Sequence, residues 1–195
     1  MNLALFDFDG TISYKDSLED FIIYVFGKPR YYSGLIYLSP LLLAWKLKLI
    51  HSEKAKARLL AYFFKGWDET VFKKKAYRYS IDCLDQIIRA QAMKKIAWHK
   101  ARGDEVVVVS ASLRYWLEDW CPQQGISLIA TELDFYQQKV TGQFAGKNCQ
   151  GKEKVRRIQA VYDLSQFERI YAYGDSKGDC QMLSLAHEAY YRNFR

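Results

Sequence analysis

A run of four consecutive valines in the segment DEVVVVSAS, residues 104–112, sets the fold class of this chain. A strand that is covered on both faces reads as a continuous apolar run, as in a parallel sheet. We therefore expect an inner strand of a parallel sheet here, ending at Ser110. Further strands are expected at residues 2–8, 126–133, 169–176 and 188–194.

Segments with helical patterning separate these strands. They span residues 82–103, 112–125, 151–164 and 178–186. A polar hairpin built around Thr141–Gly142 is expected within residues 134–144. Because strands that alternate with helices form open parallel sheets, the sequence predicts an α/β fold with a Rossmann-like, doubly wound sheet.

A long helical stretch follows the first strand, and no part of it alternates with period two. Asp16, with a glutamate three residues later, forms the pattern of a capping box, and Gly27 is expected to end that helix. We expect residues 14–82 to form a helical cap domain, and residues 1–13 and 83–195 to form the α/β core domain.

Acidic and hydroxyl side chains stand at the ends of three predicted strands. Asp7 and Asp9 follow the first strand, Ser110 ends the valine run, and Asp175 and Asp179 follow RIYAYG. In an open parallel sheet, ligands bind beyond the carboxyl ends of the strands, so these side chains are expected to converge. Carboxylates gathered without His or Cys ligands favour Mg²⁺. The sequence therefore predicts a magnesium site at this edge.

A lysine and a hydroxyl group near such a site favour phosphoryl transfer, because the charge on the phosphoryl oxygens must meet donors and cations. The segment GKEK places Lys152 and Lys154 at the start of a predicted helix. Two residues apart on a helix, these side chains point about 200° apart. Only one of them can face the site, and the helical pattern leaves the choice open.

The order of these motifs resembles that of the haloacid dehalogenase superfamily. The four motifs are DFDGT, a strand ending in Ser110, a helical lysine and GDSKGD. The helical insertion after the first motif resembles the cap of subfamily IB, the phosphoserine-phosphatase-like subgroup. The resemblance implies a Mg²⁺-dependent phosphatase that hydrolyses a phosphomonoester through an aspartyl-phosphate intermediate.

The resemblance also implies catalytic roles. Asp7 would be the nucleophile, and Asp9 the general acid that protonates the leaving alcohol and then activates water. Ser110 and a lysine would hold the phosphoryl oxygens. Lys154 fits the G-x-x-K spacing of the subgroup, with Lys152 as the alternative.

Ligands for the metal and the substrate follow from the same resemblance. Mg²⁺ would bind Asp7, the main-chain carbonyl of Asp9, and Asp175, while Asp179 would steady this shell. Besides the catalytic residues, substrate-binding positions are Gly10, Thr11, Asp16 and Ala111.

The chain departs from phosphoserine phosphatases at two places. Ala111 and Ser112 follow Ser110 where those enzymes usually have Gly-Gly, and Asp16 stands where they place a glutamate for the substrate amine. The cap segment is apolar and aromatic. A small phosphoserine-like metabolite and a lipid phosphate such as phosphatidylglycerophosphate, met at the membrane surface, both remain open as substrates.

Residues 31–50 are strongly apolar, but Pro40, Lys46 and Lys48 interrupt them. Because of these interruptions, the segment falls short of the ~20 clean apolar residues that a spanning helix needs. A buried helical hairpin is the first interpretation. A helix that lies on a membrane or receives an apolar substrate is the second, and a spanning helix the third.

The net charge of +7 suits anionic partners, while no pattern specific to nucleic acid is found. Four scattered cysteines and the lack of a leader favour the cytoplasm, with peripheral contact at the inner membrane surface as an option. The rival class is an inactive module that binds anionic membrane or RNA. The chain retains every residue of the four motifs named above, which argues against an inactive module.

Overall fold

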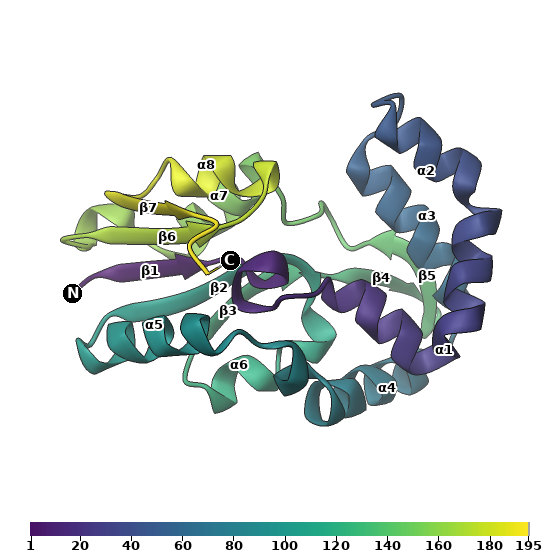
Figure 1. Ribbon diagram of the computed structural model, residues 1–195, viewed down its shortest axis with the longest axis horizontal. Helices are drawn as coiled ribbons and strands as arrows, with labels where there is room; N and C mark the ends of the chain where they lie inside the picture. The colour runs from purple at the N-terminus through teal and green to yellow at the C-terminus, as the bar shows by residue number, and fades with distance from the viewer. Residues whose placement is uncertain (195) are drawn as a thin grey trace.

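The computed structural model describes residues 1–194, in which a parallel sheet lies beside a layer of helices (Figure 1). The sheet has the strand order β3-β2-β1-β6-β7, and all its neighbouring strands are parallel. Its strands are β1 (Leu3–Phe6), β2 (Glu105–Leu113), β3 (Ser127–Thr131), β6 (Ile170–Gly174) and β7 (Glu188–Tyr191). An antiparallel hairpin is formed separately by β4 (Leu133–Tyr136) and β5 (Lys139–Phe144).

The helices divide between the two parts of the molecule. Those of the helical layer are α1 (Ser17–Tyr37), α2 (Ser39–Lys46), α3 (Ser52–Phe64) and α4 (Glu69–Asp82). Those beside the sheet are α5 (Ala90–Ala101), α6 (Trp120–Gln123), α7 (Lys152–Val161) and α8 (Cys180–Leu183).

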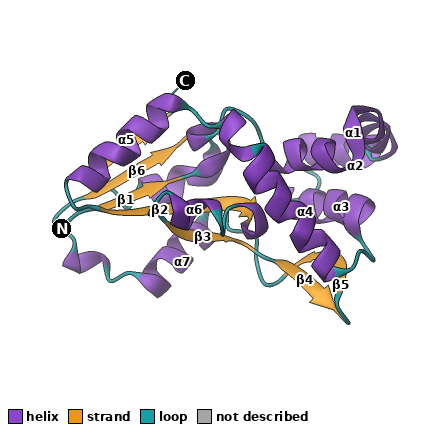
Figure 2. Cartoon of the chain, turned by 90° about the horizontal axis from the view of Figure 1, so that it is seen from below, coloured by secondary structure: helices purple, strands orange, loops and turns teal. Residues whose placement is uncertain are grey.

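Alternate residues of β1 pack on opposite faces of the sheet. Phe6 shares a core cluster with Ile96 of α5, whereas Leu5 shares a second cluster with Ile158 of α7 and Met182 of α8. Every residue of β1 is buried, as expected for a strand covered on both sides. The predicted α/β, doubly wound parallel sheet is confirmed (Figure 2).

Two of the predicted helices are altered. Gly27 adopts φ +77° and kinks α1, but the helix continues to Tyr37 because Pro29, just beyond the kink, is compatible with the start of a new helical turn. The prediction of a helix at residues 112–125 is wrong for most of that segment. There β2 continues past Ser110 through an irregular register to Leu113, and only short helical turns follow.

The predicted turn of the hairpin is also wrong. Gln137 and Gln138 form the turn, both with positive φ, and Gly142 lies inside β5. Gly142 has φ +83°, and a Cβ there would lie 2.5 Å from the Cα of Ala61 on α3. The glycine is therefore required for close packing of the hairpin on the helical layer, not for the turn.

The second segment of α1 and α2 form the apolar stretch 31–50. The interpretation of this stretch as a buried hairpin is wrong for α2, none of whose residues is fully buried. Within residues 1–194, we find no helix with the length and apolar character needed to span a membrane.

Candidate active site

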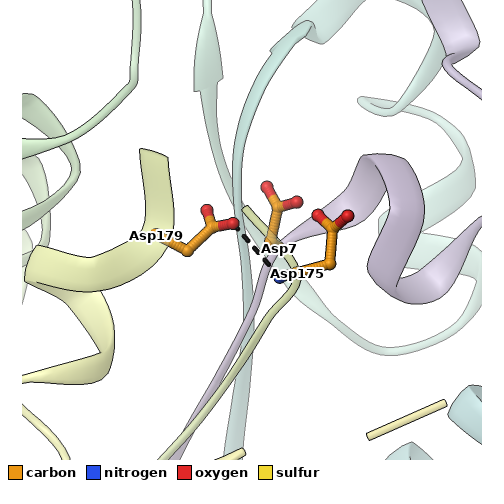
Figure 3. Close-up of side chains that lie close together, drawn as sticks. All are labelled: Asp7, Asp175 and Asp179. Carbon is orange, nitrogen blue, oxygen red and sulfur yellow. Dashed lines mark hydrogen bonds between the residues drawn. The ribbon is translucent and has the colours of Figure 1, made fainter. Parts of the chain in front are cut away.

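The carboxyl ends of β1, β2 and β6 meet at one edge of the sheet, where Asp7 follows β1, Asp175 follows β6 and Ser110 lies near the end of β2. Asp7, Asp175 and Asp179 are buried, and one oxygen of each lies within 4.8 Å of the others. Figure 3 shows the three carboxylates gathered between the loop after β1 and the turn before α8. Hard oxygen donors in this arrangement match the preference of Mg²⁺.

Gly10 permits this approach of the loops. It adopts φ +81°, and a Cβ at this position would lie 2.5 Å from Oδ2 of Asp175. Any other residue would therefore push the loop after β1 away from Asp175. The neighbouring Thr11 is buried, and its Oγ1 has no hydrogen-bond partner among the described residues.

Lys154 is the cation at the centre of the acids. Its Nζ lies 2.6 Å from Asp7 Oδ1, 2.7 Å from Asp179 Oδ1 and 2.6 Å from the carbonyl oxygen of Val109. Burial works against its charge, but the two carboxylates hold the pKa of Lys154 above its ordinary value. Lys152 is exposed on α7, so the helix directs Lys154 and not Lys152 into the site.

The two carboxylates bound to Lys154 differ in their surroundings. Burial raises the pKa of Asp7 to about 7, although the ammonium group of Lys154 opposes the shift. Asp179 is buried too, yet Lys154 and hydrogen bonds from Ser176 hold its pKa below the ordinary value. The second oxygen of Asp179 accepts hydrogen bonds from the main chain of Asp175 and from Ser176, which fixes the turn before α8.

A chain of hydroxyl groups, not predicted from the sequence, orients Asp9. The indole of Trp116 donates to Ser17 Oγ over 3.1 Å, Ser17 Oγ donates to Ser112 Oγ over 3.1 Å, and Ser112 donates to the Asp9 carboxylate. The amide of Ser17 also donates to Asp9 over 2.9 Å. Burial, followed by the charge of Asp16, raises the pKa of Asp9 to about 6.

The remaining predicted site residues lie near this centre. Ser110 and Ala111 line the pocket described below, and Ser110 Oγ accepts a hydrogen bond from the amide of Ser112. Asp16 also lines the pocket, while its side chain caps α1 by accepting from the amide of Glu19 over 3.0 Å. Thr11 is not among the described residues that line the pocket.

A pocket of about 570 Å³ opens between the acids and the helical layer. Apolar side chains of that layer line one part of it: Leu18, Tyr31, Leu42, Trp45, Ala55 and Leu59. A substrate in this pocket would meet carboxylates and a lysine at the sheet, and apolar surface toward the helices.

Three hydrogen bonds join the first turns of α3 to the core beside the pocket. Ser52 Oγ donates to Gln150 over 3.1 Å, and Glu53 accepts from the amide of Asn148 over 3.0 Å. Lys56 Nζ donates to the carbonyl of Ala111 over 2.6 Å. Burial lowers the pKa of Lys56. Lys56 was not predicted from the sequence, because the pattern of α3 does not show which of its lysines turns inward.

Comparison with known proteins places this geometry in context. The model of the haloacid dehalogenase-like hydrolase family matches residues 4–184. Protein CicA of Caulobacter vibrioides is 32% identical over 195 residues, which cover 99% of this chain and 86% of that protein. Probable phosphatase Rv3661 of Mycobacterium tuberculosis is 29% identical over 197 residues, covering 95% and 67%.

A solved structure shares the fold over most of its length. The structure of a phospho-aspartyl intermediate analogue of phosphoserine phosphatase superimposes with a TM-score of 0.68 at 18% identity, covering 95% of this chain and 83% of that one.

Proposed function

The chain belongs to the haloacid dehalogenase-like hydrolases, as its sequence predicts, and from this premise we propose that it is a phosphatase that hydrolyses a phosphomonoester through Asp7. The observation that carries the proposal is the convergence of Asp7, Lys154 and two further acids at the floor of the pocket. The relative from Mycobacterium tuberculosis, named a probable phosphatase, supports it.

In this mechanism, Asp7 attacks phosphorus and forms an aspartyl-phosphate, while the bond to the leaving oxygen breaks. Asp9 donates a proton to that oxygen and afterwards takes a proton from the water that hydrolyses the intermediate. A pKa of about 6 suits both tasks near neutral pH. Ser110 and Lys154 would hold the phosphoryl oxygens, with Lys154 released in part from Asp7 as the phosphate binds.

The residues present fit a magnesium ion. Asp7, Asp175 and Asp179 offer three buried oxygen ligands near one another, and the carbonyl of Asp9 follows in the same loop. When bound, the ion would neutralise charge on the carboxylates and on the phosphoryl oxygens. Lys154 pairs with both Asp7 and Asp179 and carries one positive charge against these two carboxylates, which favours a further cation beside them.

Substitution of the nucleophile tests the proposal. Asp7→Asn keeps the size of the side chain but removes the attacking oxygen anion, so hydrolysis of p-nitrophenyl phosphate should fall by at least about a thousandfold. Asp119→Asn, a substitution outside the pocket lining, is the matched control. Circular dichroism should show that both variants fold. A folded Asp7→Asn variant with wild-type turnover would refute the mechanism.

A further inference from the structure

The outer end of the helical layer exposes a group of large apolar side chains. They lie on the second segment of α1, on α2 and just after it, and we call them the tip: Tyr32, Ile36, Tyr37, Leu43, Trp45, Leu47 and Leu49. Between 47% and 74% of each residue is exposed. Figure 1 shows α2 at the end of the helical layer that lies away from the parallel sheet. Apolar groups clustered on a surface mark an interaction site more often than scattered ones.

The same stretch of chain carries positive charge and no negative charge. Residues 21–52 include Lys28, Arg30, Lys46 and Lys48 but no aspartate or glutamate. All four basic side chains are exposed. Exposed leucine, isoleucine and tryptophan combined with lysine are typical of segments that lie in the interface of an anionic membrane. Nucleic acid would satisfy the lysines but would leave Ile36 and the leucines in water.

The tip adjoins the pocket. Leu42 and Trp45 of α2 line the pocket that also contains Asp7 and Lys154, and Trp45 is at the same time part of the exposed tip. The apolar lining therefore continues to the outer surface. A phosphomonoester attached to an acyl chain could reach the acids along this lining while its apolar part stays covered.

We propose that the tip docks on the surface of an anionic lipid bilayer and that the pocket takes a lipid phosphomonoester from that surface. The docking is independent of catalysis. The choice of substrate rests on the proposed phosphatase function, since it assigns the chemical class that the same site would hydrolyse.

Binding to vesicles tests the docking. The full chain should sediment with vesicles of phosphatidylcholine mixed with phosphatidylglycerol, and much less with phosphatidylcholine alone. Ile36→Ser, Leu47→Ser and Leu49→Ser combined should weaken binding by at least about tenfold. Lys46→Gln and Lys48→Gln should each weaken it by roughly fivefold, with less effect at high salt.

Matched variants control for general loss of apolar or positive surface. Val71→Ser, Ile81→Ser and Val161→Ser combined remove exposed apolar side chains of other helices, and Lys74→Gln with Lys75→Gln removes exposed charge from α4. Both should bind vesicles like the wild type. If the wild type stays in the supernatant, or if tip and control variants bind alike, the docking proposal is overturned. A dimer in light scattering that the tip variant dissolves, without vesicle binding, would make the tip a protein interface and also overturn it.

Hydrolysis separates docking from substrate choice. None of the three serine substitutions in the tip touches the pocket lining, so hydrolysis of p-nitrophenyl phosphate should stay at the wild-type rate. Release of phosphate from phosphatidate in anionic vesicles should fall by at least about tenfold. Equal rates on phosphatidate for tip and control variants would refute the lipid substrate. No hydrolysis of either phosphate, with vesicle binding intact, would instead refute the phosphatase function and leave the docking standing.

Discussion

The ammonium group of Lys154 lies 2.6 Å from a carboxylate oxygen of Asp7, a residue 147 positions earlier in the chain. This ion pair joins the loop after β1 to the first turn of α7 and is almost completely buried. A buried pair of this kind fixes the Asp7 carboxylate relative to α7, and loss of either partner leaves the other charge buried and uncompensated.

Removal of Lys154 should damage both properties. Lys154→Met leaves Asp7 and Asp179 buried without their cation, so the free energy of unfolding in magnesium-free buffer should fall by about 3 kcal/mol. kcat/KM should fall by at least about a hundredfold, because the phosphoryl oxygens lose a charged donor. Urea unfolding and steady-state kinetics measure the two effects. Lys152→Met is the control, and an equal loss in both variants would contradict the assignment of Lys154.

In the step that releases the leaving group, the hydroxyl chain that ends on Asp9 should matter only when that group needs a proton. Ser112→Ala removes the donor to Asp9 and should lower kcat/KM for an alkyl phosphate by about tenfold. p-Nitrophenolate leaves without a proton, so kcat/KM for p-nitrophenyl phosphate should change little. The ratio of the two values measures the effect. Ser184→Ala, on a hydroxyl at the end of α8, is the control. Equal losses on both substrates would indicate a general structural defect.

A divalent cation should be needed for turnover. Treatment with a chelator should abolish hydrolysis, and added Mg²⁺ should restore it. Asp175→Asn removes one anionic ligand, so the Mg²⁺ concentration for half-maximal activity should rise by at least about tenfold. Mg²⁺ should also raise the melting temperature of the wild type more than that of the variant. Full activity after chelation would exclude the proposed metal site.

Stability should depend on pH through a buried network below the sheet. His99 lies 2.8 Å from Asp104 and 3.0 Å from the hydroxyl of Tyr173. Burial lowers the pKa of His99 below its ordinary 6.5. Asp104 is also buried, but hydrogen bonds from His99 and Asn2 hold its pKa below 3.8. In both cases the unfolded chain binds more protons than the folded chain once the pH falls below the ordinary pKa.

The contribution of His99 to the free energy of unfolding should therefore decline as the pH falls below 6.5, and that of Asp104 should decline below 3.8. Asp7 and Asp9, whose pKa values are raised, contribute with the opposite sign as the pH falls below 7, so the effect of His99 is read from a comparison of variants. Urea unfolding at a series of pH values measures the slope of the unfolding free energy against pH. Relative to the wild type, His99→Gln should remove the loss of stability that His99 contributes below pH 6.5. His51→Gln, which changes a histidine outside this network, is the control. An unchanged slope in His99→Gln would show that another group titrates.

The sequence predicted the parts of the site that follow from sheet topology. Asp7 and Asp175 directly follow their strands and Ser110 lies near the carboxyl end of β2, and parallel strands bring such ends together whatever the details of packing. The orientation of α7 required the structure, since the helical pattern alone allowed Lys152 as well as Lys154. Ser112 and Lys56 could not be identified as site residues from the sequence, because their contacts depend on how β2 extends and how α3 packs on the core.

Errors in the predicted elements have a related cause. Thr141–Gly142 has the composition of a turn, but the glycine is used for contact with Ala61, and the turn forms at Gln137–Gln138 instead. Gly27 has the composition of a helix end, but the helix resumes beyond it. In each case a local signal was correct about the backbone conformation and wrong about the element, since tertiary contacts decide the latter.

The packing of the hairpin on α3 has a consequence for synthesis of the chain. Val140 exchanges main-chain hydrogen bonds with Gly66 and Trp67 at the end of α3, so the helical layer is completed by a strand made much later. Helices α1 to α4 leave the ribosome before that strand exists. Their apolar side chains stay exposed to solvent until the hairpin is made and packs on them. A slow step in translation between α4 and β5 would prolong this exposure of apolar surface.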